Sequence, residues 1–275
     1  MTDKQNPLGT ATAYPSRYDP DLLFPIPRVE NRRRLAFPVG HAPFRGYDLW
    51  RAWEVSWLDL RGKPVVCIAE FLVSAVSPNM VESKSFKLYL NSLNQEKFAG
   101  LDDVQALLAK DLSDVTEAGV LVQLYPLNAF ADLQCSIPEG ESLDELDIDV
   151  DSYEPDSSLL IADQTHVVEE SVYTNLFRSN CPVTGQPDWG TVSIAYRGAA
   201  LQHDALLRYL ISFRHHNGFH EDCAEQIYRD LQQVSAPEEL TVAINFLRRG
   251  GLEINPVRTS SPASLEFPGH RLLRQ

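Results

Sequence analysis

An internal repeat is the feature that most constrains how this 275-residue chain can fold. The pattern Tyr-Leu-x-Ser at residues 89–92 recurs at residues 209–212, which is 120 residues later. The elements expected around the two copies also follow the same order. A repeat of this kind predicts two halves of similar structure that arose by duplication and then diverged.

Each half is expected to contain strands, then a pair of helices, then one or more further strands. Strict alternation of apolar residues indicates the strands, and apolar residues three or four apart indicate the helices. In the first half we expect strands at 49–60, 65–76 and 120–127 and helices at 83–93 and 101–112. In the second half we expect strands at 171–177, 191–198, 239–249 and 252–258 and helices at 205–216 and 220–234.

The acidic residues divide the chain into domains. The chain has a net charge of −14, and the segment from Glu139 to Glu170 contains twelve acids and no Lys or Arg. The remainder of the chain is therefore nearly neutral. This segment is typical of a solvated connector, and we predict modules at 1–138 and 171–275 joined by a connector at 139–170. A calcium loop is the alternative, but the glycine and final glutamate of an EF-hand are missing. The acidity also disfavours a nucleic-acid-binding surface.

The cysteines and the N-terminus indicate the compartment. The four cysteines show no C-x-x-C pair, which argues against a disulfide framework and a zinc site, so we expect no metal. The start MTDKQNPLGT is too polar for a signal peptide, and no apolar run is long enough to span a membrane. We therefore expect a cytoplasmic protein with free thiols.

One loop, SNCPVTGQPDWG at 179–190, carries a thiol and an acid at a fixed spacing. Cys181 and Asp188 flank Pro182, Gly185 and Pro187, which favour a rigid turn. A loop of this kind can present a nucleophile together with an acid/base partner. The alternative is a cysteine packed beside a surface turn.

Two lysines begin the first expected helix. Lys84 and Lys87 are three residues apart, so both project from one face of its first turn, where free backbone N–H groups also point. This pattern indicates a phosphate site. The alternative is a solvated helix face that Glu82 caps.

A second candidate cluster is Phe219, His220 and Glu221, at the start of a helix in the second half. An aromatic ring can stack on a base, a histidine can move a proton, and a carboxylate can accept the paired N–H groups of a guanine-like edge. Glu82 could serve the same ring. The alternative is a histidine cap with a glutamate that interacts with the helix dipole.

Two further residues complete the candidates. Arg249 precedes Gly250 in the turn of the last hairpin, where an arginine is usually solvated but can also bind a 2′-phosphate. No G-x-G-x-x-G follows a strand, so a Rossmann site is excluded. Cys223 is expected to be buried, and a reversible disulfide with Cys181 is a hypothesis.

Together these segments resemble one family, the bimodular 7-cyano-7-deazaguanine reductases of queuosine biosynthesis, known as QueF. The resemblance is carried by ESKSFKLYLNSLNQ from Glu82, SNCPVTGQPDWG from Ser179 and RYLISFRHHNGFHEDC from Arg208. RRGGLEINPVRTS from Arg248, the early NPLG and IPR from Ile26 support it.

The resemblance implies an α+β fold of two tandem tunnelling-fold (T-fold) ββααββ modules, with antiparallel sheets assembled into a barrel. It implies reduction of a nitrile to a primary amine by two NADPH, in a homodimer. From the acidity and the lack of a long apolar run we expect no nucleic-acid or membrane partner. By the family pattern Cys181 forms a covalent thioimide, Asp188 donates the proton and His220 assists. The positions implied for the substrate are Glu82, Ser83, Lys84, Phe219, His220 and Glu221, and those for NADPH are Lys84, Ser85, Lys87, Arg249 and Gly250.

Without the resemblance, two other functions fit the same residues. A cysteine-dependent nitrile or amide hydrolase would use the same thioimide and let water attack it. A non-catalytic purine- or pterin-binding protein would bind the ring without a covalent step. The lysines and Arg249 favour a phosphate-bearing cofactor over both.

Overall fold

The computed structural model describes residues 14–38, 42–129, 134–262, 267 and 270–275. In the first half the elements are η1 (Pro20–Leu22), β1 (Pro25–Pro27), α1 (Arg28–Arg34), β2 (Arg45–Leu58), β3 (Pro64–Ser74), β4 (Asn79–Val81), α2 (Ser83–Ser92), α3 (Leu101–Thr116), β5 (Val120–Pro126) and β6 (Gln134–Ser136). In the second half they are β7 (Glu141–Ser142), η3 (Ser157–Leu159), β8 (Ala162–Thr174), β9 (Arg178–Asn180), β10 (Pro187–Leu201), α4 (His203–Ser212), η4 (Phe213–His215), α5 (His220–Ser235), β11 (Glu239–Phe246), β12 (Leu252–Thr259) and β13 (His270–Leu272).

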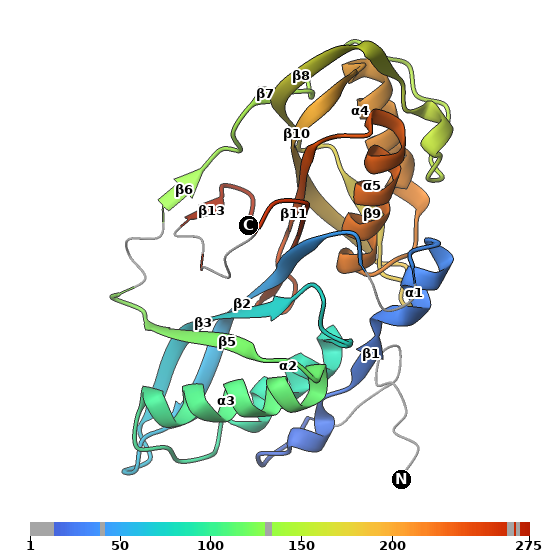
Figure 1. Cartoon of the computed structure of the whole chain (residues 1–275). Helices are drawn as coiled ribbons and strands as arrows, with labels where there is room; N and C mark the ends of the chain where they lie inside the picture. The colour runs from blue at the N-terminus through green and yellow to red at the C-terminus, as the bar shows by residue number, and fades with distance from the viewer. Residues whose placement is uncertain (1–13, 39–41, 130–133, 263–266, 268–269) are drawn as a thin grey trace.

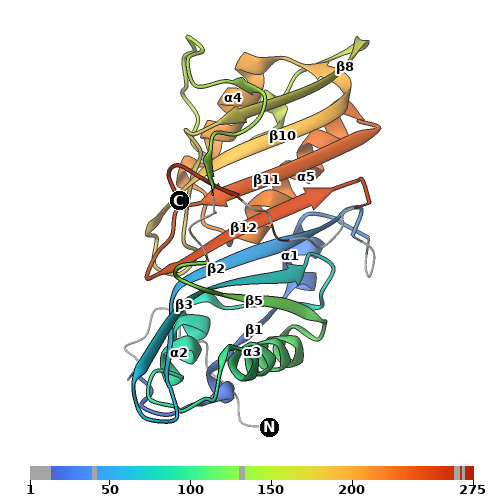
Figure 2. The same ribbon diagram turned by 90° about the vertical axis from the view of Figure 1, so that its left-hand side faces the viewer.

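One large sheet runs through both halves (Figure 2). Its strand order is β5-β3-β2-β12-β11-β10-β8-β7, with β9 paired to β10, and every pair except β7–β8 is antiparallel. Helices α2, α3, α4 and α5 cover one side of the curved sheet, while β6, β13 and the C-terminal residue lie on the other side (Figure 1). The expected α+β class with an antiparallel sheet is confirmed.

The repeat is visible in the elements as well as in the sequence. Helix α2 at 83–92 corresponds to α4 at 203–212, the same shift of 120 residues. The Tyr89 hydroxyl donates to Asp111 at 2.7 Å, and the Tyr209 hydroxyl donates to Asp230 at 2.6 Å. Each half also has its own hydrophobic core between helices and sheet. The common helix-pair packing accounts for the recurrence of Tyr-Leu-x-Ser.

The halves are not identical, and the sheet is open. The resemblance implied four strands in each module, but the first half supplies only β2, β3 and β5 to the large sheet, because β6 pairs with β13 instead. The described residues of one chain form no closed barrel. No described helix is long and apolar enough to span a membrane.

The acidic segment is anchored to the second half. Leu143 and Leu160 are buried in the core of that half, and β7 pairs with β8. Strand β8 begins at Ala162, nine residues before the expected strand. The sequence did not indicate this start because the first residues of β8 are polar on both faces and show no alternation. The carboxylates of Glu145, Asp147, Asp149 and Asp151 remain exposed at alternate positions.

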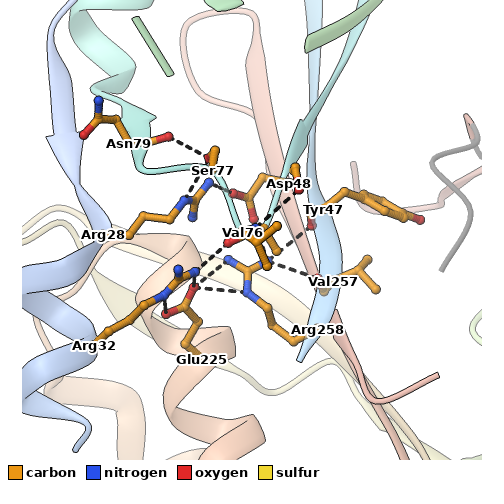
Figure 3. Close-up of polar contacts among 12 residues, drawn as sticks. Arg28, Arg32, Tyr47, Asp48, Val76, Ser77, Asn79, Glu225, Val257 and Arg258 are labelled. Atoms are coloured by element: carbon orange, nitrogen blue, oxygen red, sulfur yellow. Dashed lines mark hydrogen bonds and ion pairs between the residues drawn. The ribbon is translucent and has the colours of Figure 1, made fainter. Parts of the chain in front are cut away.

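The two halves meet where β2 pairs with β12, from Arg45 opposite Thr259 to Ala52 opposite Leu252. Beside this seam lies a buried network of ion pairs (Figure 3). Arg258 on β12 contacts Asp48 on β2 at 2.7 Å and Glu225 on α5 at 3.1 Å. Arg28 on α1 contacts the other oxygen of Asp48 at 2.5 Å. The network therefore ties elements of both halves together.

Charge pairing outweighs desolvation in this network. Burial alone would raise the pKa of Asp48, but the neighbouring Arg258 and Arg28 hold that pKa below its usual value. The side chains of Asp48 and Arg258 are both 0% exposed, so neither charge has water as a substitute partner. Removal of one partner would leave the other as an uncompensated buried charge.

We predict that Arg258→Ala lowers the free energy of unfolding by about 3–5 kcal/mol, because Asp48 and Glu225 lose a buried partner. Urea unfolding measures the change. Arg197→Ala is the matched control, since its ion pair with Glu238 is 54% and 67% exposed and should contribute at most about 1 kcal/mol. Equal losses in the two variants would contradict a structural role for the network.

Candidate active site

A cavity of about 360 Å³ opens between the two halves and collects most of the candidate residues. This volume falls within the range of about 300–1,000 Å³ typical of small-molecule sites. From the first half it is lined by Trp50, Val81, Ser83, Lys84 and Lys87. From the second half it is lined by Cys181, Pro182, Thr184, Gln186, Asp188, Gly218, Phe219, His220, Glu221, Leu247, Arg249, Gly250, Leu252 and Ile254.

The cysteine loop is a tight turn between two paired strands. The Cys181 N–H donates to the Gln186 carbonyl at 2.9 Å, and the Gly185 N–H donates back to the Cys181 carbonyl at 3.0 Å. Gly185 has a φ of +66°, a conformation that glycine adopts without strain. The loop holds the partly exposed thiol of Cys181 at the cavity wall.

Asp188 lies on a strand, whereas the sequence placed it in the loop. Strand β10 begins at Pro187, four residues before the expected strand, and Asp188 pairs with Ser179 of the short strand β9. Pro187 and Trp189 interrupt the alternation that would have indicated this pairing. Both the thiol and the acid are therefore fixed by the β9–β10 hairpin.

Two cationic or ionisable groups contact the carboxylate of Asp188, which is almost fully buried. His220 Nε2 lies 3.3 Å from Asp188 Oδ1, and an Arg249 guanidinium nitrogen lies 2.8 Å from the same oxygen. The His220 ring stacks on Phe246, with ring centroids 3.7 Å apart and planes 7° apart. This stack fixes the orientation of the ring beside the acid.

The first turn of α2 brings positive charge to the opposite wall. Burial lowers the pKa of Lys87, and the nearby Arg249 lowers it further, while Glu82, Asp188 and Cys181 act in the other direction. A Cβ on Gly250 would lie only 3.5 Å from the Lys87 side chain, so the last hairpin packs closely on this lysine. A buried ammonium beside a guanidinium is a favourable site for phosphate groups.

Glu221 is a buried acid in the cavity wall. Its side chain is 3% exposed, and burial raises its pKa to about 8, with a further contribution from the negative charge of Asp48. Arg28 opposes this rise. Burial therefore favours the protonated carboxyl group over the carboxylate.

Glu82 and Ser85 are placed behind the wall rather than in it. Glu82 is fully buried and caps α2, because its two carboxylate oxygens accept the N–H groups of Lys84 and Ser85, each at 2.7 Å. The Ser85 hydroxyl donates to the Glu82 carbonyl at 2.6 Å. Neither residue lines the cavity. The capping role that the sequence offered for Glu82 is present, and its contact with substrate stays a prediction.

Cys223 lies outside the cavity lining and is buried, and burial raises the pKa of its thiol well above the usual value. A protonated, inaccessible thiol is a poor partner for disulfide exchange. The disulfide with Cys181 stays a hypothesis.

Sequence reasoning missed the apolar side of the cavity. Trp50, Leu252 and Ile254 come from the two strands of the seam, and Phe246 supports His220 from β11. In the sequence, the pattern around each of these four residues indicates only a buried position in an alternating strand. Only the pairing of β2 with β12, a contact between distant segments, shows that these side chains share one site.

Comparison with known proteins identifies the family. The family model described as nitrile reductase, 7-cyano-7-deazaguanine-reductase N-term matches residues 14–124, and the model described as QueF-like protein matches residues 187–264. A Burkholderia ambifaria protein named NADPH-dependent 7-cyano-7-deazaguanine reductase is 52% identical over 94% of this chain and 95% of its own length. The chain belongs to the QueF nitrile reductase family.

Other QueF relatives agree with this assignment. A Burkholderia vietnamiensis protein of the same name is 51% identical over 96% of this chain and 97% of its own. A solved structure described as the archaeosine synthase QueF-Like in the apo form covers 36% of this chain at 23% identity, with a TM-score of 0.31. That likeness is too low to inform the fold.

We predict that Glu82→Ala destabilises the protein by about 0.5–2 kcal/mol, the usual effect of a lost helix cap. Glu82→Asp should retain most of the stability, because aspartate is a strong N-cap residue. Urea unfolding of the two variants measures the difference. An Ala variant as stable as the Asp variant would show that the cap contributes nothing.

Proposed function

We propose that this chain reduces the nitrile of 7-cyano-7-deazaguanine to the aminomethyl group with NADPH, in the pathway to queuosine in tRNA. Membership of the QueF family and the names of relatives about 52% identical support the reaction. The observation that carries the site is the single cavity in which Cys181 and Asp188 of one half face Lys84 and Lys87 of the other. A thiol, an acid and phosphate-binding cations are the groups that this reaction requires.

Cys181 provides the nucleophile. Its sulfur adds to the nitrile carbon, one π bond of the C≡N group breaks, and the nitrogen takes a proton, which gives a covalent thioimide. This step converts a poor electrophile into a C=N group that accepts a hydride more readily. Asp188 donates and accepts the protons, and His220, 3.3 Å from it, assists the transfer. Proton transfer of this kind typically contributes about 10²–10⁴-fold to a rate.

The residues that would hold NADPH are those of the positive wall. Lys84, Lys87, Arg249 and Gly250 line the cavity, and the partly desolvated Lys87 ammonium fits a phosphate as partner. Ser85 lies behind them in the first turn of α2. NADPH supplies two hydrides, and with two protons these convert the nitrile to a primary amine.

The deazaguanine ring is assigned to the other end of the cavity. Glu221 accepts the ring N–H and its neighbouring amino group, Phe219 covers the ring, and Ser83, Lys84 and Glu82 approach from α2. After capping, the Glu82 carboxylate retains lone pairs for a further donor. His220 is held by its stack on Phe246 and can contact the ring substituent.

We also propose the finer architecture and assembly. The modules at 1–138 and 171–275 are tandem T-fold units joined by the segment 139–170, as the equivalent helices α2 at 83–92 and α4 at 203–212 support. The open sheet of one chain exposes an edge at β5, so a second chain can close the barrel by pairing there. The functional form is then a cytoplasmic homodimer that acts on a small molecule and binds no nucleic acid.

We predict that Cys181→Ala abolishes both turnover and the covalent adduct, because the nucleophile is lost. Intact-mass measurement after mixing with the nitrile, without NADPH, detects the adduct. Cys223→Ala is the matched control and should retain both, since that thiol does not line the cavity. An adduct that persists in Cys181→Ala would contradict the assignment.

The same assay separates reduction from hydrolysis. Reduction oxidises two NADPH for each nitrile consumed, whereas a hydrolase would release the amide or acid without NADPH oxidation. Nitrile consumption with no NADPH oxidation would overturn the proposed reaction.

We predict that affinity for the nitrile rises with pH through about 8 and levels off about one unit above it, because the Glu221 carboxylate is needed and burial raises its pKa to about 8. One unit below that value, affinity should be about tenfold weaker than the plateau. Calorimetry on Cys181→Ala measures binding without the covalent step. Glu221→Gln should bind more weakly and lose this dependence. Affinity that falls as pH rises would contradict the role of Glu221.

A further inference from the structure

A second cavity, of about 820 Å³, lies beside α1 and is lined by none of the residues assigned to the reaction. Among the described residues that line it, four are arginines, Arg28, Arg32, Arg33 and Arg45, and none is acidic. Ser74, Ser77 and Ser260 also line it, although the hydroxyls of Ser77 and Ser260 already donate to the Asn79 and Leu240 carbonyls. Such a concentration of cations is unusual in a chain with a net charge of −14.

Two of the arginines that line this cavity are held by ion pairs with buried carboxylates (Figure 3). Arg32 contacts both oxygens of Glu225, at 2.7 and 3.0 Å, and also donates to the Ala75 carbonyl. Arg28 contacts Asp48 and donates to the Ser77 hydroxyl at 3.2 Å, and its side chain is 3% exposed. The remaining nitrogen of Arg28, Nη1, has no hydrogen-bond partner among the described residues.

The buried network beneath the cavity carries more positive than negative charge. The guanidinium groups of Arg28, Arg32 and Arg258 share only two carboxylates, those of Asp48 and Glu225. Two more acids, Asp222 and Glu221, face Arg28, but burial raises their pKa values to about 7 and about 8. They therefore compensate the excess only in part. A buried charge without a counter-ion is costly, and a bound anion would reduce that cost.

The rim supplies free cations. Arg33 and Arg45 are exposed, and neither forms an ion pair with another described residue. Guanidinium groups bind phosphate through paired N–H donors. The ion-paired arginines Arg28 and Arg32 and the exposed Arg33 and Arg45 together give this cavity the donors of a phosphate site.

We propose that this cavity binds a phosphate-bearing anion, with Arg33 and Arg45 as its direct partners. This cavity and the cysteine cavity share no described lining residue. The shared chemistry is a group of two or more negative charges, which inorganic pyrophosphate, a nucleoside diphosphate or the phosphates of NADPH can each supply.

Calorimetry at constant ionic strength tests the proposal with pyrophosphate, ADP and NADP⁺ as probes. In the double variant Arg33→Gln/Arg45→Gln we expect at least a tenfold loss of affinity for the probe that occupies the cavity. Arg61→Gln, an exposed arginine in the β2–β3 turn, is the matched control and should bind as the wild type does. All three proteins should unfold at the same urea concentration, because the substituted side chains are exposed.

The pattern of losses identifies the ligand. A loss for pyrophosphate or ADP with unchanged NADP⁺ affinity assigns the cavity to a separate anion. A loss for NADP⁺ assigns it to the phosphates of the cofactor. If no probe binds, or if every probe binds the double variant as tightly as the control, the proposal is wrong.

Discussion

The ion pair between Asp48 on β2 and Arg258 on β12 is the contact on which the rest of this structure depends. It lies beside the only seam in the described sheet at which strands of the two halves pair. The cavity takes Cys181 from one half and Lys87 from the other, so its geometry is set by this seam. Arg28 and Glu225 extend the same network to α1 and α5, and the charge of Asp48 also reaches Glu221.

Duplication followed by divergence explains how two halves of similar structure contribute different residues to the two sides of the cavity. Helices α2 and α4 occupy equivalent positions, but the residues equivalent to Lys84 and Lys87 are Asp204 and Leu207. The positive wall therefore exists in one copy. The cysteine loop between β9 and β10 exists only in the other copy, where the strand pairing holds a thiol and an acid together. Neither half contains a complete site.

Local patterns allowed the sequence to predict what depends on nearby residues. Helical spacing placed α2 at Ser83, and the proline-rich loop linked Cys181 to Asp188. Contacts between distant segments left no such signal. The stack of His220 on Phe246 requires the packing of α5 on β11. The desolvation of Glu221 and the arginine-lined cavity require the β2–β12 pairing or the packing of α1 on the sheet. Polar residues concealed the true start of β8, and Pro187 and Trp189 concealed that of β10.

The central claim is that both halves of one chain build one reducing site. Cys181→Ala lacks the nucleophile, and Lys87→Ala is expected to lose activity because it lacks a cation that would hold NADPH. The two variants can be expressed together with different tags and purified through both tags as mixed assemblies. If each site is built within one chain, every site in the mixture lacks a required group, and nitrile-dependent NADPH oxidation stays as low as in the separate variants. Recovery of about a quarter or more of wild-type activity would show that halves of different chains form the site, and would contradict the account.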